Sequence, residues 1–456
     1  MALNKALKQG TMEQEASPAA DLTPPAPRLR AWVVALAVLI AYIALVTDDT
    51  YLGPIPLKLF LVAGVIVTWW LQVGRKRALR EYEFALPVLL FAIGIPVVWA
   101  LIGAAQSVGG DPAGLHGLTW TMQEASRFTY LLLYFPLLDA RRIYGGRGVD
   151  VWLFPVLALC GVTVLLFLSH YLFGEPGNTP SFLIFKGVFG SNPGGFRVFI
   201  GNQVLFVVAT ALLLAEVASQ GPSRKRTGGL ALLIGCTYLS HTRGIWLGMS
   251  IVCAGILLTV LWWEVDAQRR RLIIRAASAA ALLAVVVGIG MLFGAVPHPS
   301  FLGDTSAGLR EQQAPKLWDA FKQNPVFGDG LGAVVRPRFV RDPAAPWSYE
   351  LTYLQLLFQT GVLGLLAVLA LPLAAIRRGL RNASTSELRA LPLAGAMAIL
   401  GILVASATNP YLLASYGMLC VAIGLSLVAR ADPVAPDSLR EAALARGAGG
   451  GAGSPS

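Results

Sequence analysis

Seven arginines are the first candidates for chemistry, because their placement suits the binding of an anion at a membrane surface. A guanidinium within the hydrocarbon costs on the order of 2.5–3.5 kcal/mol on insertion scales, so it should meet protein, water or a ligand. Its planar fork pairs with two oxygens at once and stays charged, which suits a diphosphate. Three of the seven lie in or at the ends of apolar runs, and these are Arg127, Arg197 and Arg243. The other four lie in one polar stretch, and these are Arg310, Arg336, Arg338 and Arg341.

Each arginine also has a plainer explanation. A basic side chain near a helix end often extends to the lipid headgroups, which would account for the three arginines of the apolar runs. The arginines at 336, 338 and 341 could equally form a solvated face or contact lipid phosphates. His241 lies two residues before Arg243, where it could serve as a polar cap or belong to the same site.

Glu350 is the candidate general base. It lies at the start of the apolar run 349–376, next to Tyr349. A carboxylate at the N-terminus of a helix is also stabilised by the helix dipole, so this position has a structural explanation as well. The functional hypothesis is that Glu350 accepts a proton close to the membrane surface, across a cavity from the arginines. Tyr349, His241 and Asp329 are the alternative bases.

A glycine-rich run at 328–332 contains Asp329 and could cradle a phosphate, although such a run more often only permits tight turns. The four histidines are scattered without a carboxylate cluster, so we expect no metal site and no cofactor. All four cysteines fall inside apolar runs and form no CxxC pair, which argues against both a disulfide framework and a thiolate metal site.

The composition predicts the kind of scaffold that holds these residues. The chain is 55% hydrophobic and only 13% charged, with a mean hydropathy of +0.64, which indicates an integral membrane protein. The net charge of +11 comes largely from basic clusters that recur between apolar runs, so we expect a membrane and no nucleic acid as its partner.

About twelve apolar runs approach the roughly 20 residues that a spanning helix needs. Basic clusters at 75–77, 141–142, 224–226, 269–271 and 377–378 follow alternate runs, so the positive-inside rule makes these loops and both termini cytoplasmic. The fourth run carries Glu124 and Arg127 and could enter the membrane obliquely. The runs are 31–46, 55–73, 84–105, 119–138, 151–173, 198–219, 228–241, 244–263, 275–296, 349–376, 390–408 and 411–429.

The predicted fold is therefore all-α, a polytopic membrane protein with one large external loop before the tenth helix. Arg197 should lie at the outer end of the sixth helix, where that helix starts. The expected organisation is a disordered cytoplasmic N-terminus at 1–30, nine transmembrane helices at 31–296, a periplasmic loop at 297–348, three helices at 349–429 and a disordered cytoplasmic tail at 430–456.

Several short motifs occur together between about residues 190 and 370. They are Thr242-Arg243-Gly244, Ser306-x-Gly308-x-Arg310, Trp318, Asn324-Pro325-x-x-Gly328-x-Gly330-x-Gly332, Tyr353-Leu354-Gln355-Leu356-Leu357 and Gly361-Val362-Leu363-Gly364-Leu365. In combination they resemble the O-antigen ligase and O-antigen polymerase superfamily. The layout of twelve helices with one large external loop is similar too, and the resemblance implies a GT-C-like fold.

The resemblance also implies an activity. Members transfer a glycan from undecaprenyl diphosphate to an acceptor hydroxyl at the external leaflet of the inner membrane, without a metal. Arg197 and Arg243 would hold the diphosphate leaving group. Family ligases carry a histidine where this chain has Glu350, and this difference argues against a ligase. A carboxylate can do the same work, as it does in inverting glycosidases.

We therefore expect a metal-independent, inverting glycosyltransferase that polymerises exopolysaccharide or O-antigen repeat units, with a lipid-linked glycan as acceptor. The alternative within the family is a ligase that transfers the glycan to lipid A core or to a protein. A lipid-linked oligosaccharide flippase is the alternative from another class, although the two halves of the chain show no matched broken helices.

Overall fold

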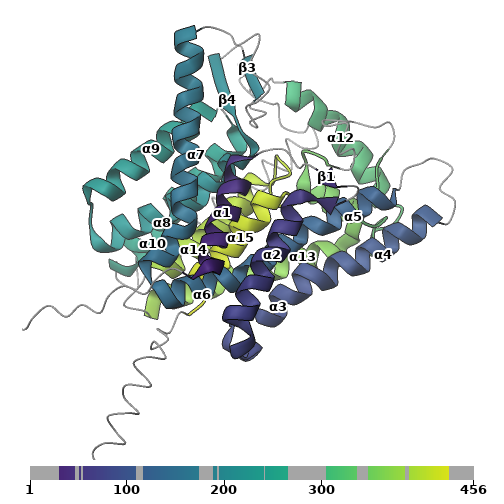
Figure 1. The fold of residues 1–456 in the computed structure, drawn as a ribbon. Coiled ribbons are helices and arrows are strands. Elements are labelled where there is room, and N and C mark those ends of the chain that lie inside the picture. The colour runs from purple at the N-terminus through teal and green to yellow at the C-terminus, as the bar shows by residue number, and fades with distance from the viewer. Residues whose placement is uncertain are drawn as a thin grey trace, which may run out of the picture. The chain divides into compact units, whose positions relative to one another are not determined.

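Helices account for most of the structure, a computed structural model in which the residues from Ala31 onward cluster as one unit. All the elements named here belong to that unit (Figure 1). The structure describes residues 30–46, 51–52, 55–108, 117–173, 188–192, 195–240, 242–264, 305–335, 348–385 and 390–430.

The first half of the chain contains helices α1 to α7. Their bounds are α1 Ala31–Leu45, α2 Leu57–Gln72, α3 Ala85–Leu89, a π-helical turn η3 at Leu90–Gly94, α4 Ile95–Val108, α5 Leu118–Arg127, a 3₁₀ segment η4 at Phe128–Leu133, α6 Tyr134–Tyr144 and α7 Gly146–Phe173. The second half contains a 3₁₀ turn η5 at Gly201–Val204, α8 Leu205–Gln220, α9 Arg224–Ser240, α10 Arg243–Glu264, α12 Thr305–Phe321, α13 Thr352–Thr385, α14 Ala390–Ala405 and α15 Ser415–Val428.

Within the described ranges, five helices are long and apolar enough to cross a membrane. They are Ala85–Gln106, Gly146–Ser169, Asn202–Gln220, Arg243–Leu261 and Thr352–Ser384. Four shorter apolar helices accompany them, and these are α1, α2, α14 and α15. The chain is thus a polytopic membrane protein, as its composition predicts. The ninth predicted run, 275–296, lies outside the described residues.

Helix α14 lies at the centre of the helical packing, against α8, α10, α13 and α15. Small residues permit this arrangement, because they let two backbones approach closely within a membrane. A Cβ atom on Gly248 of α10 would lie 2.7 Å from the carbonyl oxygen of Gly401, and one on Gly395 would lie 2.5 Å from that of Gly424. A larger side chain at either position would push the helices apart.

Helix α13 is broken at Gly361, whose φ of 65° and ψ of −172° are not helical. Residues 325–327 fill the break. The Val362 N–H donates to the carbonyl oxygen of Pro325 at 2.9 Å, and the Leu363 N–H donates to that of Val326 at 3.3 Å. Part of the polar stretch that we expected to lie wholly outside the membrane therefore packs into a spanning helix.

Two short β-hairpins occur among the described elements. The all-α prediction did not include them. Strand β1 (Tyr51–Leu52) pairs with β2 (Ile55–Pro56), and β3 (Val188–Asn192) pairs with β4 (Gly195–Phe199). Arg197 lies in β4, opposite Gly190, and the next helical turn begins only at Gly201. The prediction that Arg197 starts a helix is therefore wrong, because the glycine-rich stretch before it forms a hairpin.

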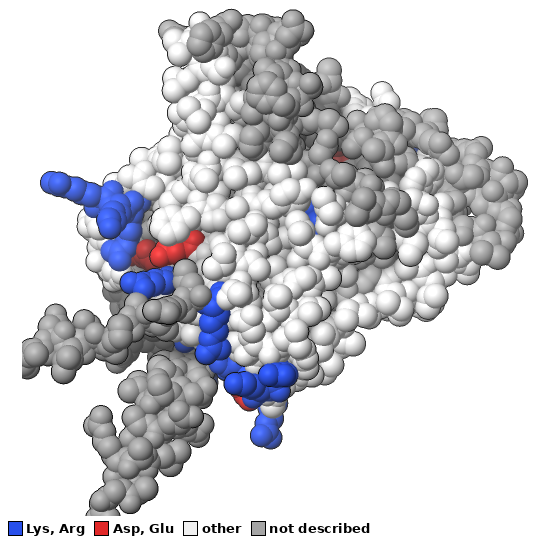
Figure 2. Space-filling model, viewed as in Figure 1, with Lys and Arg blue, Asp and Glu red and all other residues white. Residues whose placement is uncertain are grey.

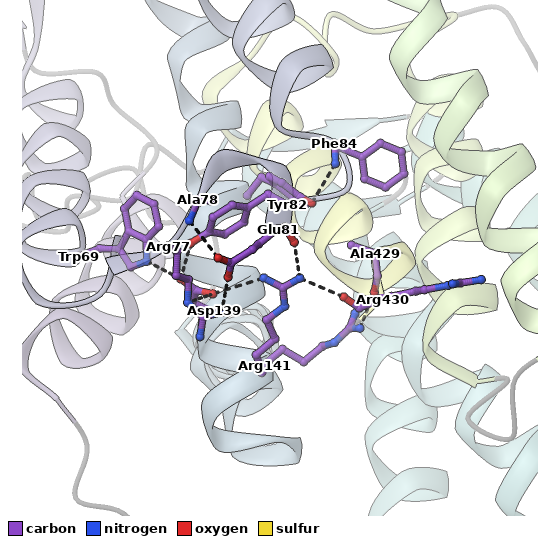
Figure 3. Close-up of polar contacts among 12 residues, drawn as sticks. Trp69, Arg77, Ala78, Glu81, Tyr82, Phe84, Asp139, Arg141, Ala429 and Arg430 are labelled. Atoms are coloured by element: carbon purple, nitrogen blue, oxygen red, sulfur yellow. Dashed lines mark hydrogen bonds and ion pairs between the residues drawn. The ribbon is translucent and has the colours of Figure 1, made fainter. Parts of the chain in front are cut away.

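A polar cluster at the end of α6 ties this helix to its neighbours (Figure 3). The buried carboxylate of Asp139 accepts hydrogen bonds from Trp69 Nε1 at 3.0 Å and from the Tyr82 hydroxyl group at 2.8 Å. The Arg77 guanidinium lies 3.4 Å from the same carboxylate. Arg141 donates to the carbonyl oxygens of Ser426 and Ala429, which joins α6 to the end of α15.

Basic side chains gather along one edge of the face in Figure 2, over the ends of α2 and α9, while the rest of that face carries few charges. The predicted cytoplasmic clusters 75–77 and 224–226 lie at the ends of these two helices. This distribution agrees with the positive-inside prediction, although which side faces the cytoplasm stays a prediction.

Candidate functional site

The candidate base lies at the contact between α12 and the start of α13. Glu350 is 3% exposed and lies two residues before the start of α13. Its Oε2 atom lies 2.7 Å from Nε of Arg310, and this contact is an ion pair whose angles do not meet hydrogen-bond geometry. Its backbone N–H donates to Oε1 of Gln313 at 3.1 Å. Arg310 and Gln313 are three residues apart on α12, so one face of that helix holds both the side chain and the backbone of Glu350.

Tyr349 is held from two sides and is a poor candidate for the base. Its N–H donates to Oε1 of Gln355 at 3.1 Å, and its hydroxyl oxygen accepts the N–H of Val335 at 2.8 Å. Burial raises the pKa of the Tyr349 phenol well above its usual range, so the group stays neutral. We therefore assign Tyr349 a structural role.

A buried carboxylate that we did not predict to belong to the site is linked to Tyr349 through Gln355. Glu124 of α5 is 1% exposed. It accepts hydrogen bonds from the N–H of Gly332 at 2.7 Å, from Nε2 of Gln355 at 2.8 Å and from Nε2 of Gln359 at 3.1 Å. Two features of the sequence could have revealed this group: a carboxylate inside an apolar run, and two glutamines four residues apart on one face of another.

The glycine-rich run 328–332 is not a phosphate cradle, because its N–H groups are bound within the protein. The N–H of Asp329 donates to Phe358 O at 3.0 Å, that of Gly330 to Gln359 O at 2.8 Å and that of Leu331 to Trp99 O at 3.1 Å. The N–H of Gly332 binds Glu124, as above. The alternative explanation, tight turns, is supported by positive φ values of 68°, 91° and 79° at the three glycines.

The glycines of this run also allow a close approach to two membrane helices. A Cβ atom on Gly330 would lie 2.2 Å from the backbone nitrogen of Gly103 in α4, and one on Gly328 would lie 2.5 Å from the Gln359 carbonyl carbon in α13. The half-buried Asp329 accepts a hydrogen bond from the side-chain amide of Asn324, so its carboxylate is engaged with its own loop.

Arg243 is exposed and begins α10. Its neighbour Gly244 packs against Asn409, since a Cβ atom there would lie 2.7 Å from Asn409 Nδ2. The carbonyl oxygen of Asn409 accepts a hydrogen bond from the Thr352 hydroxyl group at 2.9 Å. The segment around Asn409 thus joins the start of α10 to the start of α13, two residues after Glu350.

Arg127 is half-buried at the end of α5, and its Nη1 atom donates to the carbonyl oxygen of Leu413 at 3.2 Å. Part of the Arg127 guanidinium is therefore engaged in a bond within the protein. The backbone of Arg197 lies in β4, and its side chain is outside what the structure describes. His241 and the three arginines Arg336, Arg338 and Arg341 also lie outside the described residues. Within those residues, no three His, Cys, Asp or Glu side chains group as metal ligands.

The fold and this site define a class: a polytopic membrane protein with a polar segment docked on one of its spanning helices. Residues 228–369 match the family model described as O-Antigen ligase. The matched region includes Arg243, Arg310 and Glu350, and it confirms the predicted relationship to the O-antigen ligase and polymerase superfamily. No curated protein matches the chain.

Proposed function

We propose that the protein transfers a glycan from an undecaprenyl-diphosphate-linked oligosaccharide to an acceptor hydroxyl group at the outer leaflet of the bacterial inner membrane. The observation that carries this proposal is the Arg310–Glu350 ion pair, held at the start of a spanning helix within the region that matches the O-antigen ligase family. The proposal places both termini in the cytoplasm and the site on the periplasmic side of the membrane.

The chemistry assigns a role to Glu350. The acceptor oxygen attacks the anomeric carbon and forms the new glycosidic bond with inversion, while the bond from that carbon to the diphosphate breaks. The diphosphate leaves with the electron pair, and the hydroxyl proton passes to the Glu350 carboxylate. Base assistance of this kind is worth roughly 10²–10⁴-fold in rate. Because Arg310 and Gln313 fix the group, it is positioned before the acceptor arrives.

The arginines supply the second part of the chemistry. Negative charge builds on the diphosphate as the sugar departs, and guanidinium groups placed in advance stabilise it. Arg243 is the first candidate, since it is exposed at the start of α10 and its helix is joined to the start of α13 through Asn409. Arg197, Arg336, Arg338 and Arg341 remain candidates from the sequence alone.

The leading proposal is polymerisation of lipid-linked repeat units, because a carboxylate stands where family ligases carry a histidine. Ligation to lipid A core or to a protein is the second candidate, and the description of the matching family model favours it. The proposed reaction needs no cofactor in either case.

Purified protein in detergent, supplied only with lipid-linked repeat units, tests the proposal. A polymerase produces a ladder of products, whereas a ligase produces none until lipid A core or an acceptor protein is added. Since detergent leaves no membrane to transport across, turnover also separates a transferase from a flippase. If no acceptor leads to turnover of the lipid-linked donor, glycan transfer is excluded.

A further inference from the structure

Glu124 is a buried ionisable group that the proposed chemistry does not use. It lies on α5, outside the region that matches the family model, and 1% of its surface is exposed. Its two oxygens accept hydrogen bonds from one backbone N–H and two side-chain amides. A buried carboxylate is costly unless its oxygens accept hydrogen bonds, and these three bonds meet that requirement. Each of the three donors is therefore held in place by Glu124.

The contacts of Gln355 connect Glu124 to the candidate base. Gln355 donates from Nε2 to Glu124 Oε1 at 2.8 Å and accepts at Oε1 from the N–H of Tyr349 at 3.1 Å. Because the first bond fixes which end of the amide faces Tyr349, Glu124 orients the acceptor that holds the backbone one residue before Glu350. A reversed amide would place two donors against each other.

The other contacts of Glu124 hold the far side of the same structure. Gly332 donates its N–H to Glu124 Oε2, and Gln359 donates from Nε2 both to Glu124 Oε2 and to the carbonyl oxygen of Ala333 at 3.2 Å. Val335 then donates its N–H to the Tyr349 hydroxyl oxygen. One carboxylate therefore connects the two chain segments 332–335 and 349–350.

We propose that Glu124 is a positioning residue for the proposed transfer: through Gln355 and Gly332 it holds the backbone on both sides of the segment 336–347 and thereby fixes the place of Glu350. This inference rests on the proposed function for its kinetic consequence only. Its structural consequence, the order of residues 332–335 and 349–350, does not depend on which reaction the protein performs.

The test exchanges the two side chains that share the bond. Glu124→Gln removes the carboxylate at nearly constant shape. With its oxygen toward Gly332 and Gln359, the new NH₂ group faces the NH₂ group of Gln355, so the Gln355 amide loses its acceptor at position 124. In the double variant Glu124→Gln/Gln355→Glu, the new carboxylate at 355 accepts both the Tyr349 N–H and the new amide at 124. The oxygen of that amide still accepts from Gly332 and Gln359. The exchange therefore restores the bonds that join position 124, position 355 and Tyr349. It gives up the bond at 3.1 Å from Gln355 Nε2 to Gln359 Oε1, so we expect partial recovery.

Two measurements are made on the purified protein in detergent: kcat and KM for lipid-linked donor, and hydrogen exchange of peptides covering 332–335 and 349–351. Since a misplacement of about 1 Å can cost on the order of 10²-fold, Glu124→Gln should lower kcat by about 10–100-fold with KM nearly unchanged. Hydrogen exchange of both peptides should be faster in Glu124→Gln than in the native protein. The double variant should have a kcat at least about tenfold higher than that of Glu124→Gln, and its hydrogen exchange should be slower.

Asp319→Asn is the matched control. It also removes one carboxylate, but Asp319 is exposed on α12 and forms its ion pair with the exposed Lys322 just after that helix. It should leave kcat and both exchange rates as in the native protein. The inference would be overturned if Glu124→Gln had the kcat and the hydrogen-exchange rates of the native protein. It would also be overturned if the double variant folded but recovered neither kcat nor slow hydrogen exchange. If neither Glu124 variant folds, Gln355→Met decides: native kcat in that variant contradicts the proposal. If the native protein transferred no glycan, the proposed function would be refuted. The hydrogen-exchange measurement would then still test whether Glu124 holds residues 332–335 and 349–350.

Discussion

The hydroxyl oxygen of Tyr349 accepts the N–H of Val335 at 2.8 Å, so the two ends of the segment 336–347 lie against each other. That segment contains Arg336, Arg338 and Arg341. Tyr349 directly precedes Glu350. The residues on either side of the segment 336–347 are therefore linked next to the candidate base.

Gly361→Ala should destabilise the protein by more than roughly 2 kcal/mol. An alanine at a left-handed φ costs about 1–2 kcal/mol by itself, and its Cβ atom would lie 2.2 Å from the carbonyl oxygen of Val326. The loop 325–327 must then leave the break in α13. Thermal unfolding of the purified protein measures the change. Gly161→Ala in α7 is the control, since a Cβ atom there meets nothing within 4 Å.

Removing one partner of the Arg310–Glu350 pair should cost more than removing both charges. Arg310→Met removes the guanidinium of this ion pair. Removing one partner of a buried ion pair costs about 3–5 kcal/mol, and we expect less here because the Arg310 side chain is 23% exposed. The double variant Arg310→Met/Glu350→Gln should recover part of this loss. A double-mutant cycle on unfolding free energies measures the coupling. A coupling near zero would show that the ion pair does not contribute to folding.

The proposed orientation predicts which loops are accessible from outside the cell. In a Cys253→Ser background, a cysteine that replaces the exposed Gln312 of α12 should react with an impermeant thiol reagent in intact spheroplasts. A cysteine that replaces Lys225, exposed at the start of α9, should react only after the membrane is opened. The reverse pattern would place the site in the cytoplasm and exclude the external mechanism.

Arg243→Ala should abolish most of the glycan transfer while expression and membrane insertion stay normal. Arg243→Lys should also be poor, because an ammonium group lacks the bidentate fork of a guanidinium. Arg75→Ala is the control, since Arg75 is also exposed but lies in the basic cluster after α2. Near-native activity of Arg243→Ala would remove Arg243 from the diphosphate site.

Much of the architecture follows from the sequence, because apolar length and basic flanks reflect the cost of placing polar groups in a bilayer. The family relationship was likewise predictable from Arg243, Arg310 and the glycine-rich motif, and the match at 228–369 confirms it. The predicted apolar run 349–376 begins three residues before α13, and Glu350 lies two residues before that helix.

The tertiary contacts were not predictable, since a single sequence does not say which polar groups meet. Glu350 forms an ion pair with Arg310, 40 positions earlier. The N–H groups of the glycine-rich run bind groups of the protein, among them Trp99, Glu124 and Gln359, which leaves them unavailable to a phosphate. Arg197 was misplaced because the apolar run 198–219 was read as a helix from its first residue. The hairpin depends on pairing with residues 188–192, which the run does not show.

Turnover of Glu350→Gln, measured together with its melting temperature, tests the central claim most directly. The amide keeps the shape of the carboxylate but cannot accept the proton, so the account predicts a loss of about 10²–10⁴-fold in kcat. Binding of the lipid-linked donor should be nearly unchanged. If Glu350 served only the helix dipole, the variant would lose about 0.3–1 kcal/mol of stability and keep its activity. A stable or slightly less stable enzyme with native turnover would contradict the assignment of Glu350 as the base.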